Sequence, residues 1–224
     1  MKRAGLYIDG FNMYGAICES GQNHLKWLSY KAVASRIVRI EQPVLTKFFT
    51  ALRGADPDQD SRHMAYVSAL ELEGVRVVMG RFKSTQRKCK LCRGVYLAKE
   101  EKETDVNLGA HLVHDVVAGL IDAAYVFTTD SDLTGAVRLA LQARPGLRVV
   151  NVQVKTRKHC KEILGLASEG FLVEKQGLSL HMLQGCLLPE ALSRPDGSVI
   201  RRPSQYMPPG AADREPGSEP APLP

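Results

Sequence analysis

Short apolar runs alternate along this chain with longer stretches whose apolar residues recur at helical spacing. The pattern predicts strands at residues 4–9, 44–52, 75–82, 123–128, 147–154 and 171–173. It predicts helices between them at residues 29–39, 57–73, 104–120, 132–143 and 159–168. Strands separated by helices favour parallel pairing, because a crossover must return the chain to the same end of the sheet. We therefore expect a three-layer α/β fold around a mostly parallel five- or six-stranded sheet.

Aspartates stand at the ends of these predicted elements. Asp9 closes the first strand, Asp105 falls in the first turn of the helix at 104–120, and Asp130 and Asp132 follow the fourth strand. Open α/β sheets bind ligands beyond the carboxyl ends of their strands. Carboxylates that meet there repel one another unless a cation neutralises them, and Mg²⁺ or Mn²⁺ suits oxygen ligands. The pattern predicts a metal site of the kind that assists attack on a phosphodiester.

Composition narrows the class of protein. The 224 residues, 44% of them apolar, are enough for one domain with a single core. No apolar stretch approaches the roughly 20 residues of a membrane helix, and residues 1–5 show no secretory pattern, so we expect a cytoplasmic protein without a membrane partner. The five cysteines argue against a disulfide framework. A P-loop and a G-x-G-x-x-G motif are both absent, which disfavours nucleotide-cofactor enzymes.

The net charge of +6 is concentrated in one segment, residues 81–102. Its cations are Arg81, Lys83, Arg87, Lys88, Lys90, Arg93, Lys99 and Lys102. Within the segment only Glu100 and Glu101 oppose them. A basic segment between the third strand and the helix of Asp105 suits a polyanionic substrate, because its cations could hold the neighbouring phosphates. The alternative is a solvated loop that only aids solubility.

The composition changes near the C-terminus. Residues 193–224 contain eight of the twelve prolines and few large apolar residues. Such a segment buries too little surface to offset the entropy of ordering it. We therefore expect a folded domain at residues 1–192 and a disordered proline-rich tail at residues 193–224.

Three motifs in order resemble the NYN domain family, a branch of the PIN-like nuclease superfamily, in its bacterial stand-alone type. They are Tyr7-Ile8-Asp9-Gly10-Phe11-Asn12, Glu100-Glu101-Lys102-Glu103-Thr104-Asp105-Val106-Asn107 and Thr128-Thr129-Asp130-Ser131-Asp132-Leu133. The resemblance covers about residues 2–173 and implies a Rossmann-like sheet. It also implies cleavage of RNA with Mg²⁺ or Mn²⁺ held by clustered carboxylates. By motif, Asp9, Asp105, Asp130 and Asp132 would be the metal-site acids, with Asn12 beside the first.

Each of these residues also has a plainer interpretation. An aspartate after a strand is often a turn or cap residue, and a first-turn acid such as Asp105 often only satisfies the helix dipole. Asn12 could be a helix N-cap. Hydroxyl groups near Asp130 could bind substrate phosphate or water: Thr128, Thr129 and Ser131. Lys102 is a candidate for the scissile phosphate. Candidates for the neighbouring phosphates are Arg81, Lys83, Lys88, Lys90 and Arg93.

The motif Cys89-Lys90-Leu91-Cys92 has the spacing of half a zinc site. A second C-x-x-C is missing, because Cys18, Cys160 and Cys186 are isolated. The pair could be completed by a distant Cys or His, shared between two subunits of a homodimer, or be ordinary thiols in a loop. The last interpretation is slightly favoured.

The expected chemistry is hydrolysis of RNA by a metal-activated water. No protein nucleophile is needed, and no G-x-S-x-G motif is present. Two other classes fit the same fold: a non-catalytic RNA-binding or scaffold module, and a metal-dependent DNA nuclease or phosphatase. The choice of RNA over DNA rests on the resemblance, because no residue can be assigned to the 2′-hydroxyl.

Overall fold

The computed structural model describes residues 1–54 and 56–210. Its centre is a six-stranded sheet in the order β3-β2-β1-β6-β7-β8, and every neighbouring pair is parallel. The strands are β1 (Arg3–Asp9), β2 (Gln42–Thr50), β3 (Arg76–Met79), β6 (Ala123–Phe127), β7 (Arg148–Val154) and β8 (Leu172–Leu178). The predicted α/β fold with a parallel sheet is confirmed, and the central strands read as apolar runs because both faces are covered.

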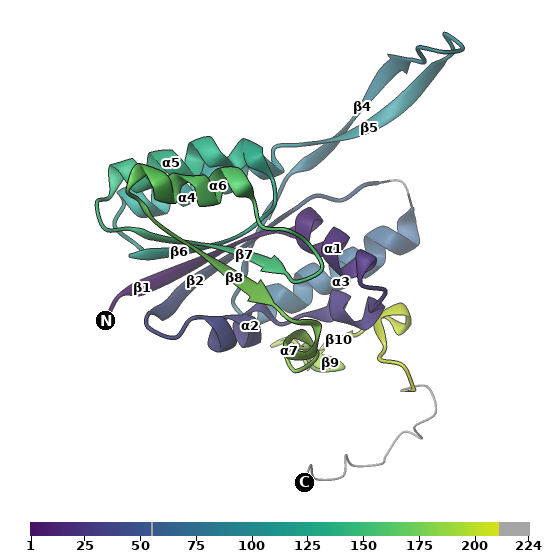
Figure 1. The fold of residues 1–224 in the computed structure, drawn as a ribbon. Coiled ribbons are helices and arrows are strands. Elements are labelled where there is room, and N and C mark those ends of the chain that lie inside the picture. Colours follow the sequence, from purple (N-terminus) through teal and green to yellow (C-terminus); the bar gives the residue numbers. More distant parts are fainter. Residues whose placement is uncertain (55, 211–224) are drawn as a thin grey trace.

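Helices cover both faces of the sheet, which makes three layers (Figure 1). One face carries α1 (Gly10–Glu19), α2 (Tyr30–Ile37), α3 (Pro57–Leu72) and the short α7 (Leu180–Gln184). The other carries α4 (Thr104–Val117), α5 (Thr134–Ala143) and α6 (Lys161–Gly165). Four 3₁₀ turns join these elements among the described residues: η1 (Asn23–Trp27), η2 (Ser131–Leu133), η3 (Leu166–Glu169) and η4 (Ser204–Tyr206).

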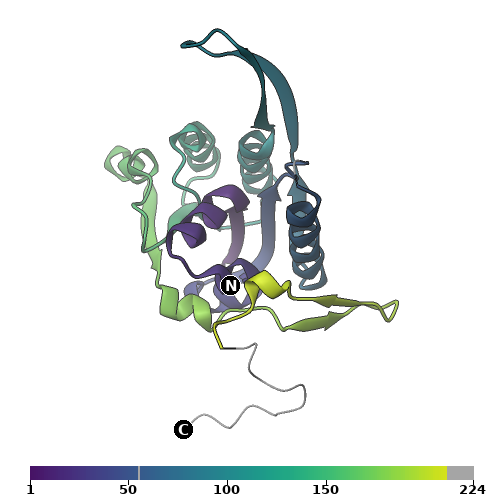
Figure 2. The same cartoon turned by 90° about the vertical axis from the view of Figure 1, so that its right-hand side faces the viewer.

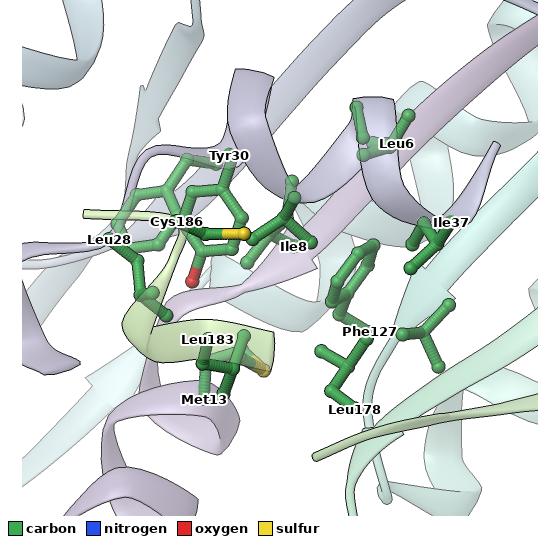
Figure 3. Close-up of a cluster of buried hydrophobic side chains, with 14 of the residues drawn as sticks. Leu6, Ile8, Met13, Leu28, Tyr30, Ile37, Phe127, Leu178, Leu183 and Cys186 are labelled. Carbon is green, nitrogen blue, oxygen red and sulfur yellow. The ribbon is translucent and has the colours of Figure 1, made fainter. Parts of the chain in front are cut away.

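Side chains along each strand alternate between the two faces of the sheet, and this divides the hydrophobic core into two halves. Leu6 and Ile8 of β1 point to the face of α1, where they meet Met13, Tyr30 and Phe127 (Figure 3). Tyr7, between them in the sequence, points to the opposite face with Leu108 and Leu112 of α4. Successive side chains of a strand face opposite sides of its sheet, so one strand serves both halves.

Residues 81–102 form a long antiparallel hairpin instead of the expected loop. β4 (Arg81–Lys88) pairs with β5 (Val95–Lys102) in continuous register, and residues 89–94 form the turn. The hairpin, called the arm below, extends away from the body in both views (Figures 1 and 2). At its base, a Cβ on Gly80 would come within 2.7 Å of Thr104 Oγ1 and 2.8 Å of the Lys102 carbonyl oxygen. Glycine therefore allows the two ends of the arm to pass closely.

The structure also differs from the expected tail. β9 (Ala191–Ser193) and β10 (Val199–Arg201) form a small antiparallel hairpin, and η4 follows it. Ile200 is buried in the core half that contains Trp27. The contact of Ile200 with the body orders this segment, and composition alone does not reveal that contact. The remainder of the expected tail, residues 211–224, lies outside the described residues.

Within the described residues, no helix combines the length and apolar character needed to span a bilayer.

Candidate functional site

Asp9 lies where β1 ends, beside the end of β6. The register pairs Ile8 with Phe127, so Asp9 is next to residues 128–130. Thr128 Oγ1 donates a hydrogen bond to Asp9 Oδ2 over 3.1 Å, and the Asn12 backbone N–H donates to Asp9 Oδ1 over 2.9 Å. Asp9 is thus the N-cap of α1 and also a buried carboxylate at the carboxyl edge of the sheet. The cap and site interpretations are compatible for this residue.

Gly10 permits this sharp transition from strand to helix. A Cβ at Gly10 would approach both the Phe48 ring and the Phe49 carbonyl oxygen to 2.7 Å. Glycine therefore allows this close backbone approach.

Asp130 and Asp132 occupy the corresponding position after β6. Asp130 caps η2 by accepting a hydrogen bond from the Asp132 backbone N–H over 2.8 Å. The Asp130 backbone N–H in turn donates to Thr128 Oγ1 over 3.0 Å. Thr128 therefore connects Asp9 and Asp130 through one hydroxyl group. Asp130 is half-buried, whereas Asp132 and Ser131 are exposed.

Asp105 reaches the same region from the first turn of α4. Burial raises its pKa to about 6, and repulsion from Asp9, Asp130, Glu101 and Asp132 adds to the rise. Burial is likewise the main cause that raises the pKa of Asp9, with Asp130 adding repulsion. The structure places the predicted aspartates within electrostatic reach of one another and adds Glu101, which the sequence presented only as a counter-charge to the basic segment. Glu101 also accepts a hydrogen bond from the Thr104 backbone N–H at the start of α4.

Asn12 is held by residues that the sequence interpretation missed. Its Nδ2 donates to Thr129 Oγ1 over 2.7 Å, and its Oδ1 accepts from Gln153 Nε2 over 3.0 Å. Gln153 and Asn151 are buried amides on β7, and Asn151 Nδ2 donates to the Thr128 carbonyl oxygen over 2.9 Å. A signal was present, because two amides interrupt the apolar run of β7. Buried amides need partners, and here the partners are the site residues.

The donor chemistry of this edge fits a hard cation. The side chains at this edge offer carboxylate oxygens, which are the ligands that Mg²⁺ and Mn²⁺ prefer. The repulsion between these carboxylates favours a bound positive charge. Across residues 1–54 and 56–210, no three Asp, Glu, His or Cys side chains are grouped as closely as ion coordination requires. Binding would therefore require the carboxylates to approach one another further.

Several of the predicted phosphate-binding cations form ion pairs in the arm. Lys102 Nζ lies 3.2 Å from Glu100 Oε2, and Glu100 also pairs with Arg87. Arg81 pairs with Glu103. Lys88 ends β4, and Lys90 and Arg93 lie in the turn at the far end of the arm. The basic segment is thus a projecting hairpin with its base beside Asp105, and Lys83, Lys88, Lys90 and Arg93 lie along it.

A cavity of about 130 Å³ opens beside the start of α1. Aromatic rings form much of its lining, from Phe11, Tyr14, Tyr30, Phe48, Tyr66 and Tyr206. Lys26 Nζ lies 4.7 Å from the centre of the Tyr14 ring at this cavity. His63 Nε2 lies 2.9 Å from Thr50 Oγ1, and burial lowers the pKa of His63, which favours the neutral ring. A flat ring could stack here next to the acidic edge.

Comparisons with known proteins are sparse. No family model matches the chain. The chain is 24% identical over 183 aligned residues to 6-hydroxy-3-succinoylpyridine 3-monooxygenase HspA of Pseudomonas putida (strain DSM 28022 / S16), with 66% of this chain covered. The chain spans only 58% of that relative's length. A solved structure of a protein of unknown function from Vibrio parahaemolyticus RIMD 2210633 superposes with a TM-score of 0.52 at 17% identity, covering 79% of this chain and 93% of that one. This second likeness extends to the fold alone.

Proposed function

We propose that the protein is a metal-dependent ribonuclease of the NYN type, hydrolysing RNA phosphodiester bonds at the carboxyl edge of the sheet. The observation that carries the proposal is the placement of Asp9 and Asp130 at the ends of adjacent parallel strands, with Asp105 facing them from α4. This edge is where open α/β sheets bind ligands.

The carboxylates of Asp9, Asp105, Asp130 and Asp132 would hold Mg²⁺ or Mn²⁺. When bound, the ion would lower the pKa of a water and neutralise charge on the phosphate oxygens. The Thr128 hydroxyl holds the Asp9 carboxylate and the Asp130 backbone N–H. Asn151 holds the Thr128 carbonyl oxygen, and Gln153 orients the Asn12 amide. The Ser131 hydroxyl, and the hydroxyl hydrogen of Thr129, whose oxygen accepts from Asn12 Nδ2, would donate to a phosphate oxygen. Glu101 would add a further oxygen donor or hold a bound water.

Two features of the surface favour a single-stranded nucleic acid as substrate, and the choice of RNA rests on the resemblance to the NYN family. The arm offers cations to a polyanion, and the cavity beside α1 offers aromatic faces to a base. Stacking on aromatic side chains is the common means of holding unpaired bases. DNA cleavage and non-catalytic RNA binding remain alternatives that the same experiment separates. The likeness to the monooxygenase, at 24% identity over 58% of that protein's length, is too distant to support the same activity in this chain.

The test is cleavage of single-stranded and structured RNA and DNA with Mg²⁺, Mn²⁺ or EDTA. We expect cleavage of RNA that EDTA stops and added metal restores. Asp130→Asn should abolish it, because a lost charged ligand weakens the ion and misplaces it. The control is Asp58→Asn, an exposed aspartate on α3, which should cleave at the wild-type rate.

Three results would contradict the proposal. Wild-type rates in Asp130→Asn would exclude the assigned site. Cleavage of DNA in preference to RNA would exclude RNA as the substrate class. RNA binding without turnover in every metal would favour a non-catalytic module.

A further inference from the structure

We propose that the turn of the arm holds half of a zinc site, and that the same turn of a second copy of this chain completes it. Cys89 and Cys92 of each copy would supply four thiolates to one ion. This inference is independent of the proposed nuclease site, which lies at the edge of the sheet.

The turn already has the form of a thiolate-binding loop. The Arg93 backbone N–H donates to the Cys89 carbonyl oxygen over 2.9 Å, and the Cys89 backbone N–H donates to the Gly94 carbonyl oxygen over 2.8 Å. Arg93 has a φ of 57°, in the left-handed region that side chains rarely adopt. These two backbone hydrogen bonds and the left-handed Arg93 close a tight turn that carries both cysteines.

The pair lacks further ligands within its own chain. Structural zinc takes four ligands in a tetrahedral arrangement, and two are present here. Cys18 lies on α1, and Cys160 and Cys186 are buried in the body. In the part of the chain that the structure describes, no third Cys, His, Asp or Glu joins the pair. The arm extends away from the body (Figures 1 and 2), so a zinc ion at this turn would take its remaining ligands from another molecule.

Exposed apolar surface favours a second arm as that molecule. A lone two-stranded hairpin is marginally stable in water. This arm exposes Leu91 by 97%, Val95 by 64% and Leu97 by 69% at and near its turn, and pairing of two arms would cover these side chains. Two basic turns repel one another. The net charge of −2 on one Zn²⁺ with four thiolates would offset part of the positive charge that Lys88, Lys90 and Arg93 of both copies bring together.

A two-fold axis through the ion satisfies this arrangement, since each copy then presents the same surface to the other. Formation of the site releases four thiol protons to solvent and changes no oxidation state. Exchange of one zinc for Co²⁺ keeps the ligands and adds visible absorption.

The experiment measures zinc content and mass on the full chain, purified with a phosphine reductant and stoichiometric zinc. We expect one zinc per two chains and a dimeric mass, and a strong zinc chelator should give monomers. Cys89→Ser and Cys92→Ser should each lose the dimer and at least tenfold in zinc affinity. Cys18→Ser, at an exposed cysteine outside the arm, should retain both. Co²⁺ loading should give the absorption of a tetrathiolate site only in proteins that dimerise.

Circular dichroism of the variants distinguishes loss of the zinc site from loss of the fold. Asp130→Asn should keep both the zinc and the dimer, which distinguishes this site from the nuclease site. One zinc per monomer would overturn the proposal. So would a zinc-free monomer, a dimer that persists in Cys89→Ser, or a dimer that survives the chelator and separates only under stronger reduction, as a disulfide would.

Discussion

Asp105 is the residue at which the repulsion between the carboxylates of the site is concentrated. Its pKa of about 6 lies above the ordinary value of 3.8, through burial and then repulsion by the neighbouring acids. A carboxyl whose folded-state pKa is raised favours the folded state at low pH, below 3.8. That contribution is lost as the pH rises through about 6. The metal-free protein should therefore lose stability between about pH 4 and pH 7.

We expect Asp105→Asn to stabilise the metal-free protein at pH 7 and to abolish metal-dependent cleavage. The neutral amide removes the repulsion, and a gain of about 1 kcal/mol is reasonable after allowance for solvent screening of a half-exposed group. Denaturant unfolding in EDTA at pH 7 and at pH 4 measures the change. The gain should shrink at pH 4, where Asp105 in the wild type is already protonated. An Asp105→Asn protein that is less stable at pH 7 would show that the acids do not strain the fold.

At the scale of elements, one buried network ties α4 to the sheet. Tyr7 of β1 and Lys47 of β2 are register partners, and both hydrogen-bond to Asp115 Oδ2 of α4. Burial raises the pKa of Asp115, but hydrogen bonds from Lys47, His114 and Tyr7 outweigh it and leave the pKa below its ordinary value. This network therefore stabilises the fold above pH 3.8 and is lost as the pH falls through the lowered pKa. Because α4 carries Asp105, the network also sets the position of the site.

Lys47→Met should destabilise the protein by about 3–5 kcal/mol, since it leaves a buried carboxylate without its cation. The double variant Lys47→Met/Asp115→Leu should recover most of that loss, because the unpaired charge is gone. Denaturant unfolding at pH 7 measures both. A single variant as stable as the wild type would mean that Asp115 is already solvated.

The central strands β1, β6 and β7 were predictable because burial on both faces gives each of them an apolar run. The edge strand β8 extends to Leu178, beyond the predicted residues 171–173, because its polar residues 174–176 hide the strand pattern. The start of the helix predicted at residues 57–73 is also confirmed, since the Asp56 side chain accepts from the Asp58 and Gln59 backbone N–H groups and Pro57 opens α3. Helix α1 was not predicted, because Gly10 and Gly15 have low helix propensity. Its position follows from the Asp9 cap.

The arm and the residues behind the site could not be derived in the same way. A polar, charged sequence without a buried face is typical of a loop. The arm is stabilised by cross-strand pairing, which the periodicity of the sequence does not reveal. The positions of Asp9, Asp105, Asp130 and Asp132 were predictable because each ends or begins an element. Gln153 and Asn151 were not, since their role depends on which strands become neighbours.

For the whole molecule, the important property is the separation of charge between an acidic edge and a basic arm. Asp9, Asp105 and Asp130 lie at the carboxyl end of the sheet, and the arm that starts beside them carries Lys88, Lys90 and Arg93 at its far end. A polyanion bound along the arm would be led toward the acids. Contacts of this kind release counterions, so they weaken as salt is added.

We therefore expect neutralisation of Lys88, Lys90 and Arg93 to glutamine to weaken binding of all single strands about equally. The dependence of log affinity on log salt should flatten by roughly 0.7 for each lost contact. Binding is measured in the Asp130→Asn background, which should not cleave, over a salt series. The control neutralises three cations on and after α2: Lys31, Arg36 and Arg39. It removes the same charge and should leave the slope unchanged. Phosphate contacts carry little sequence information, so any cleavage preference should survive in the triple variant with Asp130 intact. An equal slope in the arm variant and the control would mean that the arm does not touch the nucleic acid.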